Sequence, residues 1–164
     1  MEMRVIFYRC AVAGVLLSLT AAWCGQLEDG IAASERGDFK SAFSVFSQLA
    51  SNGNAQGQFQ LSLLYTFGRG VKPDAKTALY WLRQAAIHGD SQAQSNLGVA
   101  FNRGRGVPQD EIKAYAWFTL AATAGDAVAV TNREIASRKF TPAQLEQAKA
   151  LALICQGGNF KPCL

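Results

Sequence analysis

Small and apolar residues recur along this chain at the spacing of one helix face, and the pattern occurs three times. The first set falls at positions i, i+4, i+7 and i+8, as Ala42, Phe46, Leu49 and Ala50. The pattern recurs 36 and then 72 residues later, as Ala78, Leu82, Ala85 and Ala86, and as Ala114, Phe118, Ala121 and Ala122. Such a stripe predicts an amphipathic helix packed against a core. We therefore expect three equivalent helices, the first from about Phe39 to Ser51.

A second stripe precedes each of the last two helices. It comprises Gly57, Leu61, Leu64 and Tyr65, and again Ala93, Leu97, Ala100 and Phe101. Gly57 and Ala93 are small, which lets two helices approach closely. Phe59 and Leu63 lie on the opposite face, so we expect this helix to be packed on two sides, as in stacked hairpins.

A glycine-rich segment, Gly68-Arg69-Gly70-Val71, joins the two helices and recurs as Gly104-Arg105-Gly106-Val107. The first glycine can adopt the left-handed conformation that ends a helix, and the second permits a further turn. The valine can fill the hairpin, and an aspartate (Asp38, Asp74 or Asp110) can cap the helix that follows. No Gly-Lys-Ser/Thr follows, so these segments do not match a phosphate-binding loop. Only the arginine has no structural role that the pattern explains.

Residues 54–89 and 90–125 align without gaps and are identical at thirteen of 36 positions. This period predicts an all-α solenoid of stacked helical hairpins. We divide the chain into a leader (1–24), a degenerate first repeat (25–53), two repeats (54–89 and 90–125), and a partial repeat with a C-terminal cap (126–164). A short helix is expected from Leu27 to Arg36, and a final helix from about Pro142 to Cys155.

The second repeat carries the residues Ala93, Leu97-Gly98, Gly104-x-Gly106-Val107, Asp110, Ala114, Trp117, Ala121-Ala122 and Gly125. This combination resembles the Sel-one-like repeat, a relative of the tetratricopeptide repeat. The resemblance implies an α/α superhelix whose relatives act as adaptors, assembly factors or host-interaction proteins. It does not imply one ligand.

The N-terminus has the order of a secretory signal peptide: two arginines, an uncharged run from Cys10 to Cys24, and small residues near its end. Cleavage after Ala22 or after Cys24 fits this order, while an uncleaved anchor and lipidation are the alternatives. We expect an exported protein, periplasmic or secreted, that meets the membrane only through this leader. In an oxidising compartment Cys155 and Cys163 could form a disulfide, with two free thiols as the alternative.

Charge and motifs argue against several functions. The formal net charge is +4, or about +3 without Arg4, Arg9 and Glu2, which does not indicate a nucleic-acid-binding protein. His88, the only histidine, falls near a helix C-terminus and has no partner motif for a metal site or a triad. We therefore predict no enzymatic activity, no cofactor and no metal.

A partner-binding surface is the remaining functional option. Amides on the concave flank could bind peptide backbone or sugar, and arginines in the turns could meet an acidic partner, although ordinary solvated residues would look the same. The candidate residues are Gln56, Gln60, Arg69, Gln92, Asn96 and Arg105. Trp81 and Trp117 fit core positions better than a binding platform.

We predict a non-enzymatic protein–protein interaction or scaffold module of the bacterial cell envelope, with a protein or peptide partner that the sequence does not identify. The alternatives are binding of a cell-wall polymer, β-lactamase-like activity, and a structural spacer in an envelope assembly.

Overall fold

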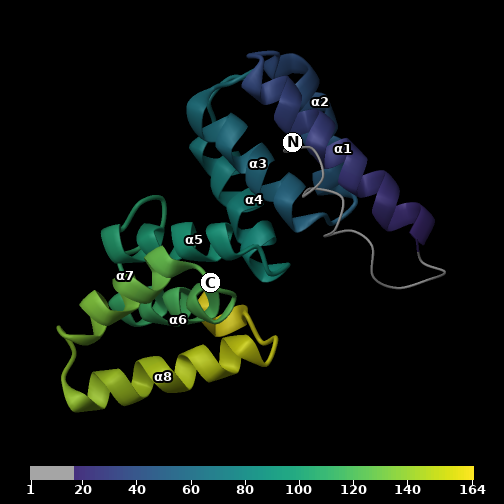
Figure 1. The fold of residues 1–164 in the computed structure, drawn as a ribbon. Helices are drawn as coiled ribbons and strands as arrows, with labels where there is room; N and C mark the ends of the chain where they lie inside the picture. The colour runs from purple at the N-terminus through teal and green to yellow at the C-terminus, as the bar shows by residue number, and fades with distance from the viewer. Residues whose placement is uncertain (1–16) are drawn as a thin grey trace.

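The computed structural model describes residues 17–164, with side chains from residue 25 onward. Within this range the secondary structure is helical, without strands. The helices are α1 (Leu17–Glu35), α2 (Phe39–Ser51), α3 (Ala55–Phe67), α4 (Ala75–Ile87), α5 (Ser91–Arg103), α6 (Glu111–Thr123), α7 (Ala127–Ser137), α8 (Pro142–Gln156) and the short 3-10 helix η2 (Lys161–Cys163). The pairs α1/α2, α3/α4 and α5/α6 form successive hairpins that pack on one another (Figure 1). The predicted all-α solenoid is confirmed.

The two ends of the chain show where the predicted helix bounds succeed and fail. The final helix ends at Gln156, one residue beyond the predicted end. The first helix is much longer than the predicted Leu27–Arg36, because the uncharged stretch from Leu17 contains no proline that would end it. Most of the predicted leader, residues 1–16, lies outside the described residues. Among the helices that the structure describes, none is both long and apolar enough to cross a membrane.

Side-chain caps mark the start of each helix from α2 to α8. Asp38, Asp74 and Asp110 accept backbone N–H bonds at the starts of α2, α4 and α6, as predicted. The first helices of the second and third hairpins have equivalent caps, Asn54 in α3 and Asp90 in α5. These caps stabilise the helix starts because they bind N–H groups that have no partner within the helix.

Asp90 provides a test of how charge affects these caps. Burial raises the pKa of its carboxyl, and this effect outweighs the backbone N–H bonds from Ala93 and Gln92, which lower it. A raised pKa in the folded state means that ionisation of Asp90 lowers stability as the pH rises through that pKa. We expect Asp90→Asn, which reproduces the neutral cap at Asn54, to increase the denaturation midpoint relative to the wild type at pH 7. The gain should disappear below about pH 3.8, where both states are protonated.

Asp74→Asn is the matched control for this prediction, because the hydrogen bonds from Thr77 lower the pKa of Asp74. Because its pKa is lowered, the ionised Asp74 carboxylate stabilises the fold above about pH 3.8. This stabilisation is lost as the pH falls through the pKa of Asp74 in the folded state. Asp74→Asn should therefore lower the midpoint at pH 7. Urea unfolding at several pH values measures both midpoints. If both variants shifted the midpoint at pH 7 in the same direction, burial of Asp90 would not be the cause.

The repeated stripes form the core. Of the twenty residues in the two kinds of stripe, seventeen are buried, and Tyr65, Leu82 and Ala122 are half-buried. Trp117 is fully buried, as predicted, whereas Trp81 at the equivalent position is only half-buried. Val107 is buried within its hairpin, which confirms its expected filling role. The pattern of apolar residues therefore identified most of the core correctly.

Two buried glutamines link successive hairpins. The Nε2 atom of Gln58 donates to the Ala50 carbonyl at 3.1 Å, and Gln94 makes the equivalent bond to Ala86 at 3.0 Å. The Oε1 atom of Gln58 lies 2.8 Å from Nδ1 of His88, which caps the C-terminus of α4. His88 therefore has the structural position predicted for it, and it also connects α4 to α3.

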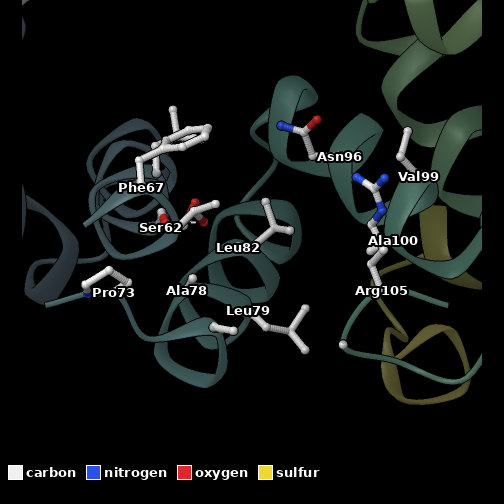
Figure 2. Close-up of a pocket in the computed structure, with 14 residues that line it drawn as sticks. Ser62, Phe67, Pro73, Ala78, Leu79, Leu82, Asn96, Val99, Ala100 and Arg105 are labelled. Carbon is white, nitrogen blue, oxygen red and sulfur yellow. Dashed lines mark hydrogen bonds between the residues drawn. The ribbon is translucent and has the colours of Figure 1, made fainter. Parts of the chain in front are cut away.

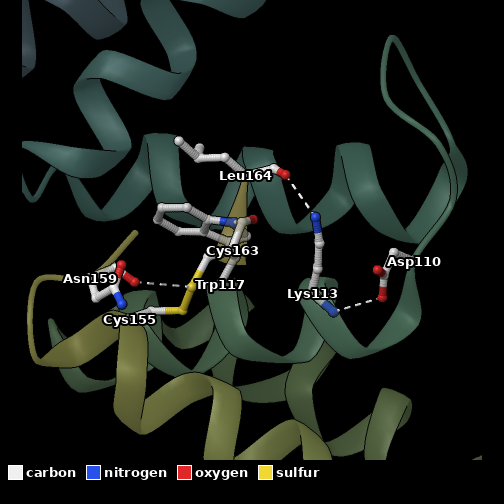
Figure 3. Close-up of a disulfide and its surroundings, with 7 residues drawn as sticks. All are labelled: Asp110, Lys113, Trp117, Cys155, Asn159, Cys163 and Leu164. Carbon is white, nitrogen blue, oxygen red and sulfur yellow. Dashed lines mark hydrogen bonds between the residues drawn. A yellow bond between two sulfur atoms is a disulfide. The ribbon is translucent and has the colours of Figure 1, made fainter. Parts of the chain in front are cut away.

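The C-terminal tail is held against α6. Cys155 on α8 and Cys163 in η2 form the predicted disulfide (Figure 3). The indole Nε1 of Trp117 donates to the Cys163 carbonyl at 2.9 Å, and the Trp117 ring stacks on Phe160 with centroids 5.7 Å apart. Lys113 Nζ donates to the Leu164 carbonyl at 2.7 Å. Because α8 and this tail cover α6, they end the array in place of a further regular hairpin.

Candidate functional site

A groove of about 730 Å³ lies between the α3/α4 hairpin and α5. This volume is within the usual range of about 300–1,000 Å³ for binding pockets. The residues that line it are Ser62, Leu63, Thr66 and Phe67 of α3, Pro73 before α4, Ala75, Ala78, Leu79 and Leu82 of α4, Asn96, Val99 and Ala100 of α5, and Arg105 and Gly106 in the next turn. The groove therefore joins two repeats, and neither repeat could form it alone.

The arrangement of the wall is visible in Figure 2. Phe67 and Pro73 stand on one side, Asn96 and Arg105 stand on the other, and Leu82 lies between them. Alanines at the close-contact positions of α4 and α5 leave room there, because their side chains end at Cβ. The result is an open, mostly apolar groove with hydroxyls on the α3 side and an amide and a guanidinium on the opposite side.

Phe67 is the aromatic residue among those that line this groove. It ends α3, directly before the left-handed Gly68, and 62% of its surface is accessible. An exposed ring beside a concave apolar surface is typical of a binding site, since covering it removes a large area from water. The sequence did not identify Phe67, although its place just before the repeated glycine-rich turn could have drawn attention to it.

Asn96 and Arg105 are the two predicted site residues that line the groove. Both are exposed, and no carboxylate is among the lining residues. The salt bridges of the described residues, Lys139–Glu111 and Lys149–Glu146, do not involve Arg105. The guanidinium of Arg105 is therefore available to an acidic group of a ligand.

Arg69 has a structural role that the sequence analysis missed. Its guanidinium lies 5.4 Å from the ring centroid of Phe39 and 5.2 Å from that of Phe67, so it contacts aromatic rings of two hairpins. The prediction that the arginine has no structural role is therefore wrong for Arg69. The equivalents of Phe39 and Phe67 are Ala75 and Arg103, so the same contacts are impossible for Arg105.

The remaining predicted residues lie elsewhere. Gln56 and Gln92 are exposed in the first turns of α3 and α5, and Gln60 is half-buried. None of the three lines the groove. The lining part of α3 is its C-terminal half, so the structure does not bring these glutamines together with Asn96 and Arg105.

The groove has chemistry suited to non-covalent binding. Its polar side chains are hydroxyls, one amide and one guanidinium, with no acid–base pair among the lining residues. Across the described residues, no group of three or more His, Cys, Asp or Glu side chains could hold a metal ion. The site offers apolar contact, hydrogen bonds and positive charge.

Comparisons with known proteins agree with this architecture. Residues 55–90 and 91–126 each match the family model of the Sel1 repeat. The solved structure of c5321, described as a protective antigen present in uropathogenic Escherichia coli strains and displaying an SLR fold, is similar with a TM-score of 0.75 and 31% identity. That match covers 88% of this chain and 32% of the other chain.

A Sel1 repeat protein from Oxalobacter formigenes is also similar, with a TM-score of 0.62 and 24% identity over 87% of this chain and 61% of that chain. The chain thus spans about a third of the first of these structures and less than two thirds of the second. A comparison with curated proteins gives no match.

Proposed function

This chain is a Sel1-repeat protein, and from that premise we propose that it is a non-enzymatic interaction module whose groove between α3, α4 and α5 binds a segment of another protein. Sel1 repeats generally mediate protein interactions. The observation that carries the proposal for this chain is an exposed Phe67 facing an unpaired Arg105 across an apolar groove. Aromatic and arginine side chains are the residues that most often dominate binding energy at protein interfaces.

The groove is better suited to a protein segment than to a catalytic role. Binding a side chain between Phe67 and Leu82 would remove apolar surface from water on both partners. Arg105 would select against basic segments, and Asn96 could bond to a backbone amide. Specificity would then come from a few polar groups around an apolar contact, as is usual for such sites.

Site-specific photocrosslinking in the native cells tests this function. With p-benzoylphenylalanine in place of Phe67, we expect a cross-link to one protein that mass spectrometry identifies. Arg105→Glu should remove most of this product without lowering the melting temperature, because Arg105 is exposed and forms no salt bridge. Arg69 is left unchanged, since its aromatic contacts support the fold.

The same photoreactive residue at Leu153 is the control, because Leu153 is 68% exposed on α8 and does not line the groove. If both positions gave the same products, or if Phe67 gave none, the groove would not be the binding site.

Export to the cell envelope is the second part of the proposal. It is supported by the basic, apolar and small-residue order of residues 1–24 and is compatible with a Cys155–Cys163 disulfide. N-terminal sequencing of the protein from the periplasmic or culture fraction should find a new terminus at Trp23 or Gly25. An intact Met1 terminus recovered only from the cytoplasmic fraction would contradict export.

A further inference from the structure

A second pocket, of about 320 Å³, lies between α5, α6 and α7. It is lined by Val99, Asn102 and Arg103 of α5, Phe118 of α6, Val128, Asn132, Ile135 and Ala136 of α7, and Lys139 after it. Val99 also lines the groove described above, so the two share a wall. The two hollows are therefore neighbours along one surface of the array.

The second pocket is the repeat equivalent of the first. Seven of its nine lining residues stand 36 positions after a residue that lines the groove. The pairs are Leu63 and Val99, Thr66 and Asn102, Phe67 and Arg103, Leu82 and Phe118, Asn96 and Asn132, Val99 and Ile135, and Ala100 and Ala136. This correspondence follows from the solenoid, since equivalent side chains of successive hairpins face the same surface. It means that a ligand crossing both hollows meets similar geometry twice.

An amide occurs at the same place in both hollows. Asn96 is exposed in the first and Asn132 is half-buried in the second. An amide side chain both donates and accepts hydrogen bonds, as does each peptide unit of an extended chain. Two such amides at repeat spacing suit a ligand with a regular polar backbone.

The charge differs between the two hollows. The aromatic Phe67 of the first is replaced by Arg103 in the second, and Lys139 stands at the next equivalent position. Arg105 lies in the turn after α5, on the wall of the first hollow. No carboxylate lines either hollow, and only Lys139 of these three cations forms a salt bridge, at 3.8 Å to Glu111. Apolar side chains therefore line both hollows, including the exposed Val128 and Ile135 in the second, while the exposed ring of Phe67 belongs to the first. Arg103 ends α5, the helix that the two hollows share, and Arg105 follows it in the next turn.

We propose that the two hollows form one continuous site for an extended peptide segment of another protein, with apolar residues against Phe67 in the first hollow and acidic residues at the C-terminal end of α5, where Arg103 and Arg105 lie. This rests on the proposed function and specifies the class of partner. Asn96 and Asn132 bind the peptide backbone, Arg103 and Arg105 bind the carboxylates, and Phe67 packs on the apolar residues. Charge complementarity selects an acidic segment, because bringing a basic one to these arginines is unfavourable.

Fluorescence anisotropy with labelled ten-residue peptides tests this inference on the full chain. The probes contain Leu-Val-Phe at one end and Asp-Glu-Asp-Glu at the other, in both orders. We expect the peptide with one of these two orders to bind more tightly than the control peptides. In the controls, lysines replace the acidic residues or serines replace the apolar residues. Affinity should fall as salt rises, and Arg103→Ala with Arg105→Ala should weaken it by about tenfold or more.

Arg138→Ala is the matched control, since Arg138 is exposed at the end of α7 and lines neither hollow. It should leave the affinity unchanged, and Asn132→Ala should reduce it. Equal binding of acidic and lysine-containing peptides would overturn the inference. Equally tight binding of an oligo-dT strand, or occupation of the groove by a second copy of this chain, would also overturn it.

The two proposals can fail separately. If the acidic peptides do not bind but Phe67 cross-links to a partner in an Arg105-dependent manner, the interaction function stands and the acidic-peptide inference is wrong. If neither result is obtained, both are wrong.

Discussion

Replacing Trp117 by alanine is expected to lower the free energy of unfolding by about 3–5 kcal/mol, the range for truncating a fully buried aromatic side chain. Trp117 is completely inaccessible and contributes three different contacts: core packing, the stack on Phe160, and the hydrogen bond to the Cys163 carbonyl. The variant leaves a cavity in α6 and a carbonyl without its donor. Urea unfolding followed by circular dichroism would measure the loss.

Trp81→Ala is the control, because Trp81 occupies the equivalent position one repeat earlier but is only half-buried. A loss of about 1–2 kcal/mol is expected there, since less apolar area leaves water on folding. The difference between the two variants measures what the C-terminal tail adds at Trp117. Equal losses would show that this tail contributes little to stability.

Replacing Gly70 by alanine is the second substitution for which we expect a large effect, about 2–4 kcal/mol. Gly70 has φ of 72°, a left-handed conformation that disfavours a side chain. In addition, a Cβ atom there would overlap the backbone carbonyl of Phe39 at the start of α2. The turn of one repeat presses on the backbone of the preceding hairpin, and backbone cannot move aside as a flexible side chain can.

Gly106→Ala isolates the conformational part of this effect. Gly106 has nearly the same φ, 73°, but its added Cβ would meet only the end of the Leu79 side chain, at 3.4 Å. We expect a loss of about 1–2 kcal/mol from the left-handed conformation alone. If the two variants were equally destabilised in thermal and urea unfolding, close contact at Phe39 would not be the reason for the second glycine.

These contrasts show that equivalent positions of the array have different environments. Trp117 is covered by the C-terminal tail, and Trp81 has no comparable cover. Arg69 lies over two aromatic rings, whereas Arg105 faces the groove. Solenoids allow such variation because each unit depends mainly on its immediate neighbours. The same position of the repeat therefore contacts aromatic rings in one unit and lines a groove in the next.

Local sequence patterns determined the helices, their caps and most of the core. The stripe from Ala42 to Ala50 and its two copies specify which face is buried, and Asp38, Asp74 and Asp110 mark where helices begin. These features depend on residues within a few positions of one another, so spacing alone reveals them. The disulfide was also expected from sequence, with two free thiols as the alternative, because the N-terminal segment predicts an oxidising compartment and only eight positions separate the two cysteines.

Only the tertiary structure decided where the groove lies. The groove brings Phe67 of one repeat to Arg105 of the next, and its shape depends on how the hairpins are rotated against each other. Helical periodicity shows which residues lie outside the buried face of a helix. It does not show which of these residues line the open space between that helix and a neighbouring hairpin. For that reason the sequence identified Asn96 and Arg105, included glutamines that lie elsewhere, and missed Phe67, Asn132 and the aromatic contacts of Arg69.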